Sequence, residues 1–159
     1  MTVDIRPMHA DDALEIQRQP SQRIQLGMDR EMTREEAEAL ADGPGEAWCA
    51  RVDGRIVALT GLRETFPGVQ AVAWAILSTG IGAAHLAVTR HARRRIADSA
   101  YRRIEAIVRV DVPAEVAWAK LVGLAPAHVL HCFGAASEPH LLCELVRPAP
   151  GAATIAGGG

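Results

Sequence analysis

Cysteine and metal-binding patterns are scarce in this chain of 159 residues. The three cysteines, Cys49, Cys132 and Cys143, include no C-x-x-C pair. We therefore expect neither a disulfide framework nor a zinc site, and the low cysteine content fits a reducing compartment. His85 and His91 lack the i,i+4 spacing of a helical metal pair, so no metal site of that kind is expected.

Long hydrophobic runs are also missing. Apolar stretches such as Val69–Leu77 are far shorter than the roughly 20 residues that a membrane-spanning helix needs. The first residues show no basic segment followed by an apolar one, so we expect no signal peptide and a cytoplasmic location. With 49% hydrophobic and 23% charged residues, the chain is expected to fold as one domain.

No charge of one sign dominates, since the formal net charge is −2. Acidic residues prevail in residues 1–50, which carry 11 acids and 5 bases, whereas residues 51–110 carry 4 acids and 10 bases. This balance argues against a nucleic-acid partner. The basic middle of the chain still has room for a local anion site.

Hydrophobic periodicity and turn signals predict the element order β-α-α-β-β-β-α-β-α-β-β. Asp53-Gly54 between two apolar runs predicts a hairpin, and Thr33 with Glu36 predicts a capping box at a helix start. Pro113 suits the first turn of a further helix. Strands are expected at 2–7, 47–52, 55–62, 69–77, 104–110, 128–133 and 141–146, and helices at 9–17, 33–41, 83–100 and 113–122.

An antiparallel meander followed by β-α-β-α predicts an α+β domain with a mixed, mostly antiparallel sheet and helices on both faces. We expect this domain to cover residues 1–147. Residues 148–159, rich in Pro, Ala and Gly, are expected to form a C-terminal arm. Thr154, Ile155 and Ala156 in this arm are candidates for pairing with a sheet edge of another protein chain.

Several segments of this pattern carry a family resemblance. They are Met1–Ala13, the strand ending in Val108-Arg-Val-Asp111, and the short helix followed by Leu121-Val-Gly123-Leu124. In this order, over about residues 2–147, the chain resembles the GNAT superfamily, the Gcn5-related N-acetyltransferases. Arg93-Arg-Arg-Ile96, together with Trp118 five residues before Gly123, further resembles GNAT-like proteins encoded by tailed bacteriophages.

The GNAT resemblance implies an acetyl-CoA site in a notch between the fourth and fifth strands. The pyrophosphate of the cofactor would lie on a loop patterned Arg/Gln-x-x-Gly-x-Gly/Ala at a helix N-terminus. The candidate residues are Ser78, Thr79, Gly80, Ile81 and Gly82. Both glycines of the pattern are present, but Leu77 replaces the Arg or Gln and the loop is short. A tight strand-to-helix turn is therefore the favoured interpretation.

Arg90, Arg93 and Arg94 share a helix face by their spacing and are candidates for a phosphate contact. They begin two turns into the predicted helix. A solvated face or a protein interface is therefore the favoured interpretation.

A proton donor and a general base are hard to place. The resemblance implies a tyrosine at the position of Ala119, and the only tyrosine, Tyr101, lies at the end of the preceding helix. Glu105, Glu64 and His131 are the candidates for a base if the protein is an enzyme. Each of them is better explained as an ordinary strand or loop residue, so no catalytic residue is assigned.

Trp48, Trp74 and Trp118 each lie within an apolar element and are expected to anchor the core. An exposed Trp118 would instead mark a docking surface for another chain.

The vacant acid position at Ala119 and the short loop favour a GNAT-fold protein that has lost acetyl transfer, binds no cofactor and serves as a structural or assembly component of a phage particle. Such a protein would pair with copies of itself or with virion proteins. The alternative is a working N-acetyltransferase that uses acetyl-CoA at Ser78–Gly82. A non-catalytic acyl-CoA sensor is a third possibility, because function depends on the site rather than on the fold.

Overall fold

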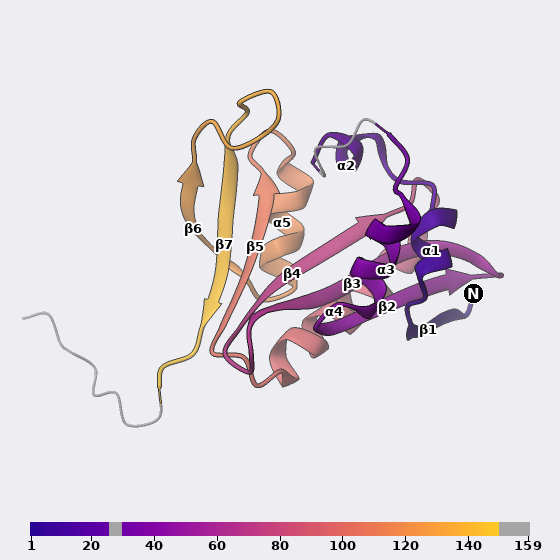
Figure 1. The fold of residues 1–159 in the computed structure, drawn as a ribbon, viewed down its shortest axis with the longest axis horizontal. Helices are drawn as coiled ribbons and strands as arrows, with labels where there is room; N and C mark the ends of the chain where they lie inside the picture. The colour runs from indigo at the N-terminus through magenta and orange to yellow at the C-terminus, as the bar shows by residue number, and fades with distance from the viewer. Residues whose placement is uncertain (26–29, 150–159) are drawn as a thin grey trace, which may run out of the picture.

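A seven-stranded sheet organises the protein, whose computed structural model describes residues 1–25 and 30–149 (Figure 1). The strands are β1 (Val3–Pro7), β2 (Gly45–Val52), β3 (Arg55–Phe66), β4 (Gln70–Leu77), β5 (Arg103–Arg109), β6 (Ala125–Leu130) and β7 (His140–Val146). The helices are α1 (Ala10–Glu15), α2 (Pro20–Gln25), α3 (Arg34–Asp42), α4 (His85–Asp98), α5 (Pro113–Leu121) and the 3-10 turn η1 (Gly82–Ala84).

The strand order is β1-β2-β3-β4-β5-β7-β6. Neighbouring strands are antiparallel, except that β4 and β5 run parallel. The predicted α+β class with a mixed, mostly antiparallel sheet is confirmed.

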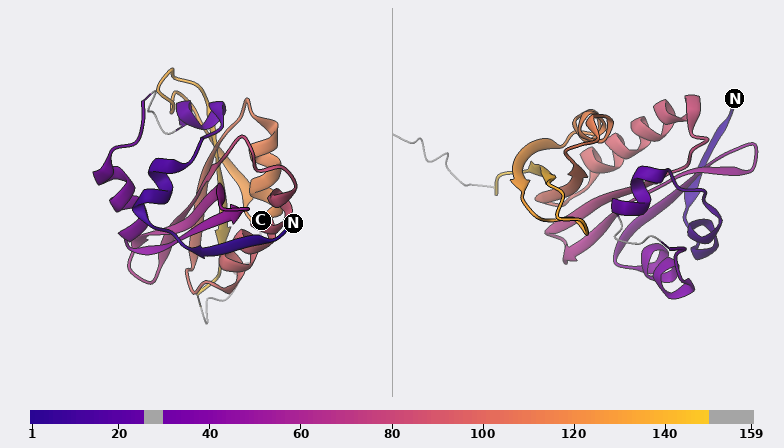
Figure 2. Two further views of the ribbon diagram at one scale, coloured as in Figure 1. Left: turned by 90° about the vertical axis from the view of Figure 1, so that its right-hand side faces the viewer. Right: turned by 90° about the horizontal axis from the view of Figure 1, so that it is seen from above.

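Helices cover both faces of the sheet (Figure 2). On one face, Ala13 of α1 and Ala37 of α3 pack against Leu59 and Ile76 of the sheet. On the other face, α4 and α5 pack against the sheet through the apolar stripes expected of amphipathic helices. The buried residues that α4 and α5 contribute there are Val88, Ile96 and Ala119.

The predicted capping box and the predicted hairpin turn are both present in the structure. The Glu36 amide donates to Thr33 Oγ1 at 3.2 Å, and the Thr33 amide donates to Glu36 Oε2 at 2.8 Å, as a capping box requires. The side chain of Arg30 also binds this carboxylate, which lowers the pKa of Glu36 to about 2. Asp53 and Gly54 have φ angles of 48° and 79° in the predicted hairpin turn.

Several segments differ from the prediction, and β3 runs on to Phe66 instead of ending at residue 62. Pro20, expected only to break the preceding helix, begins α2, because proline suits the first helical position. Strand β6 lies at 125–130 instead of 128–133, since Pro126 is tolerated on an edge strand. Cys132 is therefore exposed in the turn that follows β6, and Cys143 lies opposite Pro126 rather than opposite Cys132.

The predicted arm and its Thr154, Ile155 and Ala156 fall largely or wholly outside the described residues, so the boundary at residue 147 stays a prediction. Within residues 1–25 and 30–149, no helix combines the length and the apolar character required to cross a bilayer.

Candidate functional site

A gap between two parallel strands defines the candidate site. β4 and β5 pair only where Gln70, Ala71 and Val72 meet Arg103, Ile104 and Glu105. Beyond this point β4 runs on to Leu77 beside β3, and β5 runs on beside β7. The two strands thus form a V that opens toward their carboxyl ends (Figure 1). We call this gap the notch.

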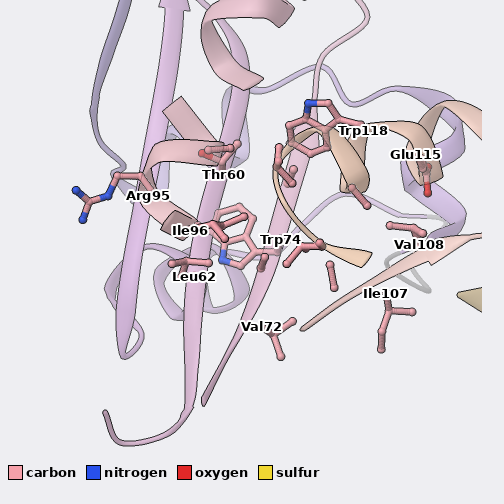
Figure 3. A pocket seen from close by; sticks show the side chains of 18 of the residues that line it. Thr60, Leu62, Val72, Trp74, Arg95, Ile96, Ile107, Val108, Glu115 and Trp118 are labelled. Atoms are coloured by element: carbon pink, nitrogen blue, oxygen red, sulfur yellow. The ribbon is translucent and has the colours of Figure 1, made fainter. Parts of the chain in front are cut away.

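A cavity of about 240 Å³ passes through the sheet at the notch. Trp74 and Gln22 line it on the side of α1–α3, whereas Ala106 and Ala119 line it on the side of α4 and α5. Figure 3 shows the apolar side chains that gather around this space. Its walls are mainly apolar, and many of their residues are small: Gly61, Ala73, Ala75, Ala92, Ala106 and Ala119.

The cavity extends beneath α4 into a space that we call the α4 compartment, bounded by Leu62, Ala92 and Ile96. An ion pair closes its far end. Arg95 Nε donates to Glu46 Oε1 at 2.8 Å, and the guanidinium lies 5.2 Å from the ring centroid of Trp48. Burial alone would raise the pKa of Glu46, but the hydrogen bonds and charge of Arg95 hold it below its ordinary value. Glu46 is therefore a bound carboxylate.

A side chain from α2 occupies the free edge of β4 in the notch. The Leu77 amide donates to Gln22 Oε1 at 2.6 Å, and Gln22 Nε2 donates to the Ala75 carbonyl at 3.3 Å. Gln22 is only 7% exposed. These bonds replace the ladder that β5 would supply in a continuous sheet. An extended ligand with amide groups can pair with the same edge once Gln22 moves away.

The five loop residues 78–82 form a tight turn between β4 and η1. Four of their amides already donate within the protein: Ser78 to Val57 O at 3.0 Å, Thr79 to Gln17 O at 3.3 Å, Gly80 to Ser78 Oγ at 3.1 Å, and Ile81 to Ser78 O at 3.3 Å. Gly82 has a φ of 43°, and the position of a Cβ there is open. The loop therefore has the geometry of a tight turn, in which Thr79, Gly80 and Gly82 are exposed.

Beside Gly82 lies a second hollow of about 510 Å³, between the start of α4 and the end of α5. Arg90 and Arg93 line it together with Gly82, whereas Arg94 does not, and all three arginines are exposed. Two of the three predicted arginines thus line the same hollow as the glycine of the loop. Arg90 and Arg93 lie in the middle turns of α4, and their two guanidinium groups favour an anionic group such as a phosphate in this hollow.

Trp118 separates the hollow from the cavity. Its Nε1 donates to Thr89 Oγ1 at 2.7 Å, and its ring lies 5.9 Å from that of His85. Thr89 and His85 line the hollow, and Trp118 lines the cavity. The indole is partly buried between α4 and α5, so its role as a docking surface stays a prediction.

The three candidate bases lie elsewhere in the structure. Glu105 forms an ion pair with Arg103. Glu64, on β3, accepts hydrogen bonds from the Tyr101 hydroxyl at 3.2 Å and from a backbone amide. Burial and this carboxylate raise the pKa of Tyr101. His131 lies in the turn after β6. None of the three lines the cavity.

Sequence reasoning missed the polar residues of the cavity, which are Gln22, Glu46, Thr60, Arg95 and Glu115. Glu115 lies in the first turn of α5, and its Oε2 accepts a hydrogen bond from the Arg109 amide at 3.1 Å. An acidic residue three positions after Val112 indicates the start of a helix. It does not indicate that the side chain lines a cavity. Gln22 follows the predicted helix break at Pro20. Its neighbours in the sequence therefore gave no indication that its side chain contacts β4.

Solved structures with this architecture are acetyltransferases of the GNAT fold. No family model matches the chain, and no curated protein matches it in sequence. Ard1 from Thermoplasma volcanium has a TM-score of 0.72 at 12% identity, covering 94% of this chain and 100% of that chain. The ribosomal-protein-S18-alanine N-acetyltransferase from Escherichia coli has a TM-score of 0.71 at 13% identity, covering 96% and 99%.

The yncA protein from Salmonella typhimurium, solved with its cofactor acetyl-CoA, has a TM-score of 0.70 at 14% identity, covering 96% of this chain and 100% of that chain. The chain therefore has the GNAT fold, as its resemblance to that superfamily implied. At these identities the likeness concerns the fold alone.

Proposed function

We propose that this protein is a GNAT-fold acyltransferase that binds an acyl-CoA in the notch and transfers the acyl group to an amine. One observation carries the proposal: β4 and β5 part after three paired residues and leave a cavity through the sheet. Ligands of open sheets with parallel strands bind where the carboxyl ends of the strands diverge. The arginine-lined hollow lies beside that opening and suits the phosphates.

The residues present fit such a ligand. Arg90 and Arg93 would hold phosphate groups, with Gly82 allowing close approach of the backbone. The free edge of β4 at Ala75 and Leu77 would pair with the amides of the pantetheine arm in place of Gln22. The bound acyl-CoA supplies a reactive thioester.

Glu115 is the candidate for the general base. It is a carboxylate that lines the cavity at the open end of the V, while Glu46, the other carboxylate of the lining, is bound by Arg95. Its Oε2 is held by the Arg109 amide, which fixes the side chain in place. A positioned carboxylate can take a proton from an attacking amine.

A second candidate function is a GNAT-fold protein without transfer activity. Two observations favour it: the methyl group of Ala119 lines the cavity where the resemblance implies a tyrosine, and four loop amides already have partners. In that case the domain at 1–147 would act through contacts with other chains, as in a phage particle, and Trp118 and residues 154–156 would be the contact candidates.

Isothermal titration calorimetry of the full chain with acetyl-CoA tests the proposal. We expect saturable binding that weakens about tenfold when Arg90 or Arg93 is replaced by alanine, because each change removes a charge-assisted hydrogen bond. Arg94→Ala on the same helix is the matched control and should leave binding unchanged. Binding without acetylation of any amine in a panel would favour the second candidate, and no binding at millimolar ligand would reject the acyltransferase.

A further inference from the structure

The α4 compartment adds apolar space to the notch beneath α4. We propose that the acyl group accepted at this site is a saturated chain longer than acetyl, such as hexanoyl, and that its tail lies in the α4 compartment. This inference rests on the proposed function, because it assigns the substrate class of the same notch.

The volume supports a chain of this length. Protein interiors are normally packed with few voids larger than a water molecule. An apolar cavity of about 150 Å³ holds one benzene ring, that is, six carbons. The present cavity of about 240 Å³ comprises the notch and the α4 compartment together, so the sulfur end of the ligand and an acyl chain longer than acetyl would share it.

The chemistry of the walls selects an apolar tail. Leu62, Ala92 and Ile96 bound the compartment with carbon atoms. The charged groups at the far end, Glu46 and Arg95, are already paired with each other. A charged or strongly polar acyl group would lose its hydration there without gaining new partners.

The position of the compartment follows the direction of the ligand. A pantetheine arm that pairs with β4 from Leu77 toward Ala75 points to the apex of the V at Val72, where β4 and β5 join. The part of the cavity beneath α4 lies on the side of Ala73 and Leu62. The atoms that follow the sulfur of an acyl-CoA are its acyl chain, so this chain would enter the compartment.

Small side chains keep the space open. Ala92 projects from α4 toward the same buried cluster as Leu62 and Ile96, and Ala73 packs there from β4. A leucine or isoleucine at either position would fill the compartment with protein atoms. The chain thus has short side chains at the points where a core would ordinarily be filled.

Calorimetric titrations of the full chain with acetyl-, hexanoyl- and octanoyl-CoA test the inference. Each buried methylene contributes about fourfold in affinity, so hexanoyl-CoA should bind on the order of 100-fold more tightly than acetyl-CoA. Equal affinities for the three would overturn the inference and leave the proposed function intact. Binding of none would overturn the proposed function itself. Free octanoate binding as tightly as octanoyl-CoA would overturn the assignment to acyl-CoA.

Filling the compartment provides the structural control. Ala92→Leu should abolish the preference for hexanoyl-CoA while acetyl-CoA still binds, and Ala92→Val should reduce that preference in part. Ala97→Leu, at an exposed position of the same helix, is the matched variant and should keep it. Thermal unfolding of each variant verifies that it folds. A folded Ala92→Leu protein that retains the full chain-length preference would contradict the proposal.

Discussion

The indole Nε1 of Trp118 donates a 2.7 Å hydrogen bond to Thr89 Oγ1 and joins α5 to α4 beside the notch. These two helices flank the two strands that part, and they also meet through the rings of His85 and Trp118 and share a buried cluster. The indole lies between the cavity and the arginine-lined hollow.

Removing this bond should weaken the contact between α4 and α5. Trp118→Phe keeps the aromatic packing but loses the donor, and we expect a loss of about 1 kcal/mol in the free energy of unfolding. Thr89→Val should cost a similar amount. Urea unfolding of the double variant should show a loss close to that of either single variant, because both changes break the same bond. Fully additive losses would show that the bond does not stabilise the fold.

Gln22 should compete with the ligand for the edge of β4. Gln22→Leu leaves the Ala75 carbonyl and the Leu77 amide without their present partner, so we expect a loss of about 1 to 2 kcal/mol in stability without ligand. Affinity for CoA should rise several-fold, because no hydrogen bonds to β4 have to be broken before the ligand pairs with it. Gln17→Leu, an exposed glutamine before α2, serves as the control in both calorimetry and unfolding. Weaker binding by Gln22→Leu would contradict the competition.

Glu115 should act on the rate and not on cofactor binding. Glu115→Gln keeps an oxygen that can accept the Arg109 amide but removes the base, so the rate of acyl transfer should fall about 100-fold. The dissociation constant of acetyl-CoA should change less than threefold. Glu105→Gln, outside the cavity, is the control and should leave the rate within twofold of the wild type. Equal rates for the wild type and Glu115→Gln would remove Glu115 from the reaction.

Asp12 should make the free energy of unfolding fall as the solution becomes acidic. Asp12 is 2% exposed and accepts hydrogen bonds at 2.8 Å from the His9 amide, Arg6 and Arg51. Burial would raise the pKa of Asp12, but these donors outweigh burial and keep it below its ordinary value of 3.8.

Because the folded state favours the carboxylate of Asp12, its contribution is present above pH 3.8 and is lost as the pH falls below that value. Asp12→Asn should lower the free energy of unfolding by about 2 to 3 kcal/mol at pH 7, since Arg6 and Arg51 lose the carboxylate that they share. Urea titrations at several pH values should show a smaller acid-induced loss in the variant than in the wild type. Parallel curves would exclude Asp12 as the source.

Local signals explain which parts of the fold the sequence could predict. Thr33 with Glu36, Asp53 with Gly54, and Pro113 each act within a few residues, and each helix start or turn formed where these residues indicated. Strand β6 was misplaced because its hydrogen bonds depend on β7 and on an edge position that permits Pro126.

The site depends on contacts that no local pattern contains. Gln22 meets Leu77 across 55 residues, and Arg95 meets Glu46 across 49. The loop of residues 78–82 could be located from its two glycines. Whether its amides were available to an anion depended on Val57 and Gln17, which only the folded chain brings to them.

A crystal structure of the full chain grown with saturating acetyl-CoA tests the central claim most directly. The account predicts a pantetheine arm between β4 and β5, the Gln22 side chain displaced from Leu77, and phosphate groups at Arg90 and Arg93. A structure with Gln22 still bonded to Leu77 and no ligand in the notch would contradict it.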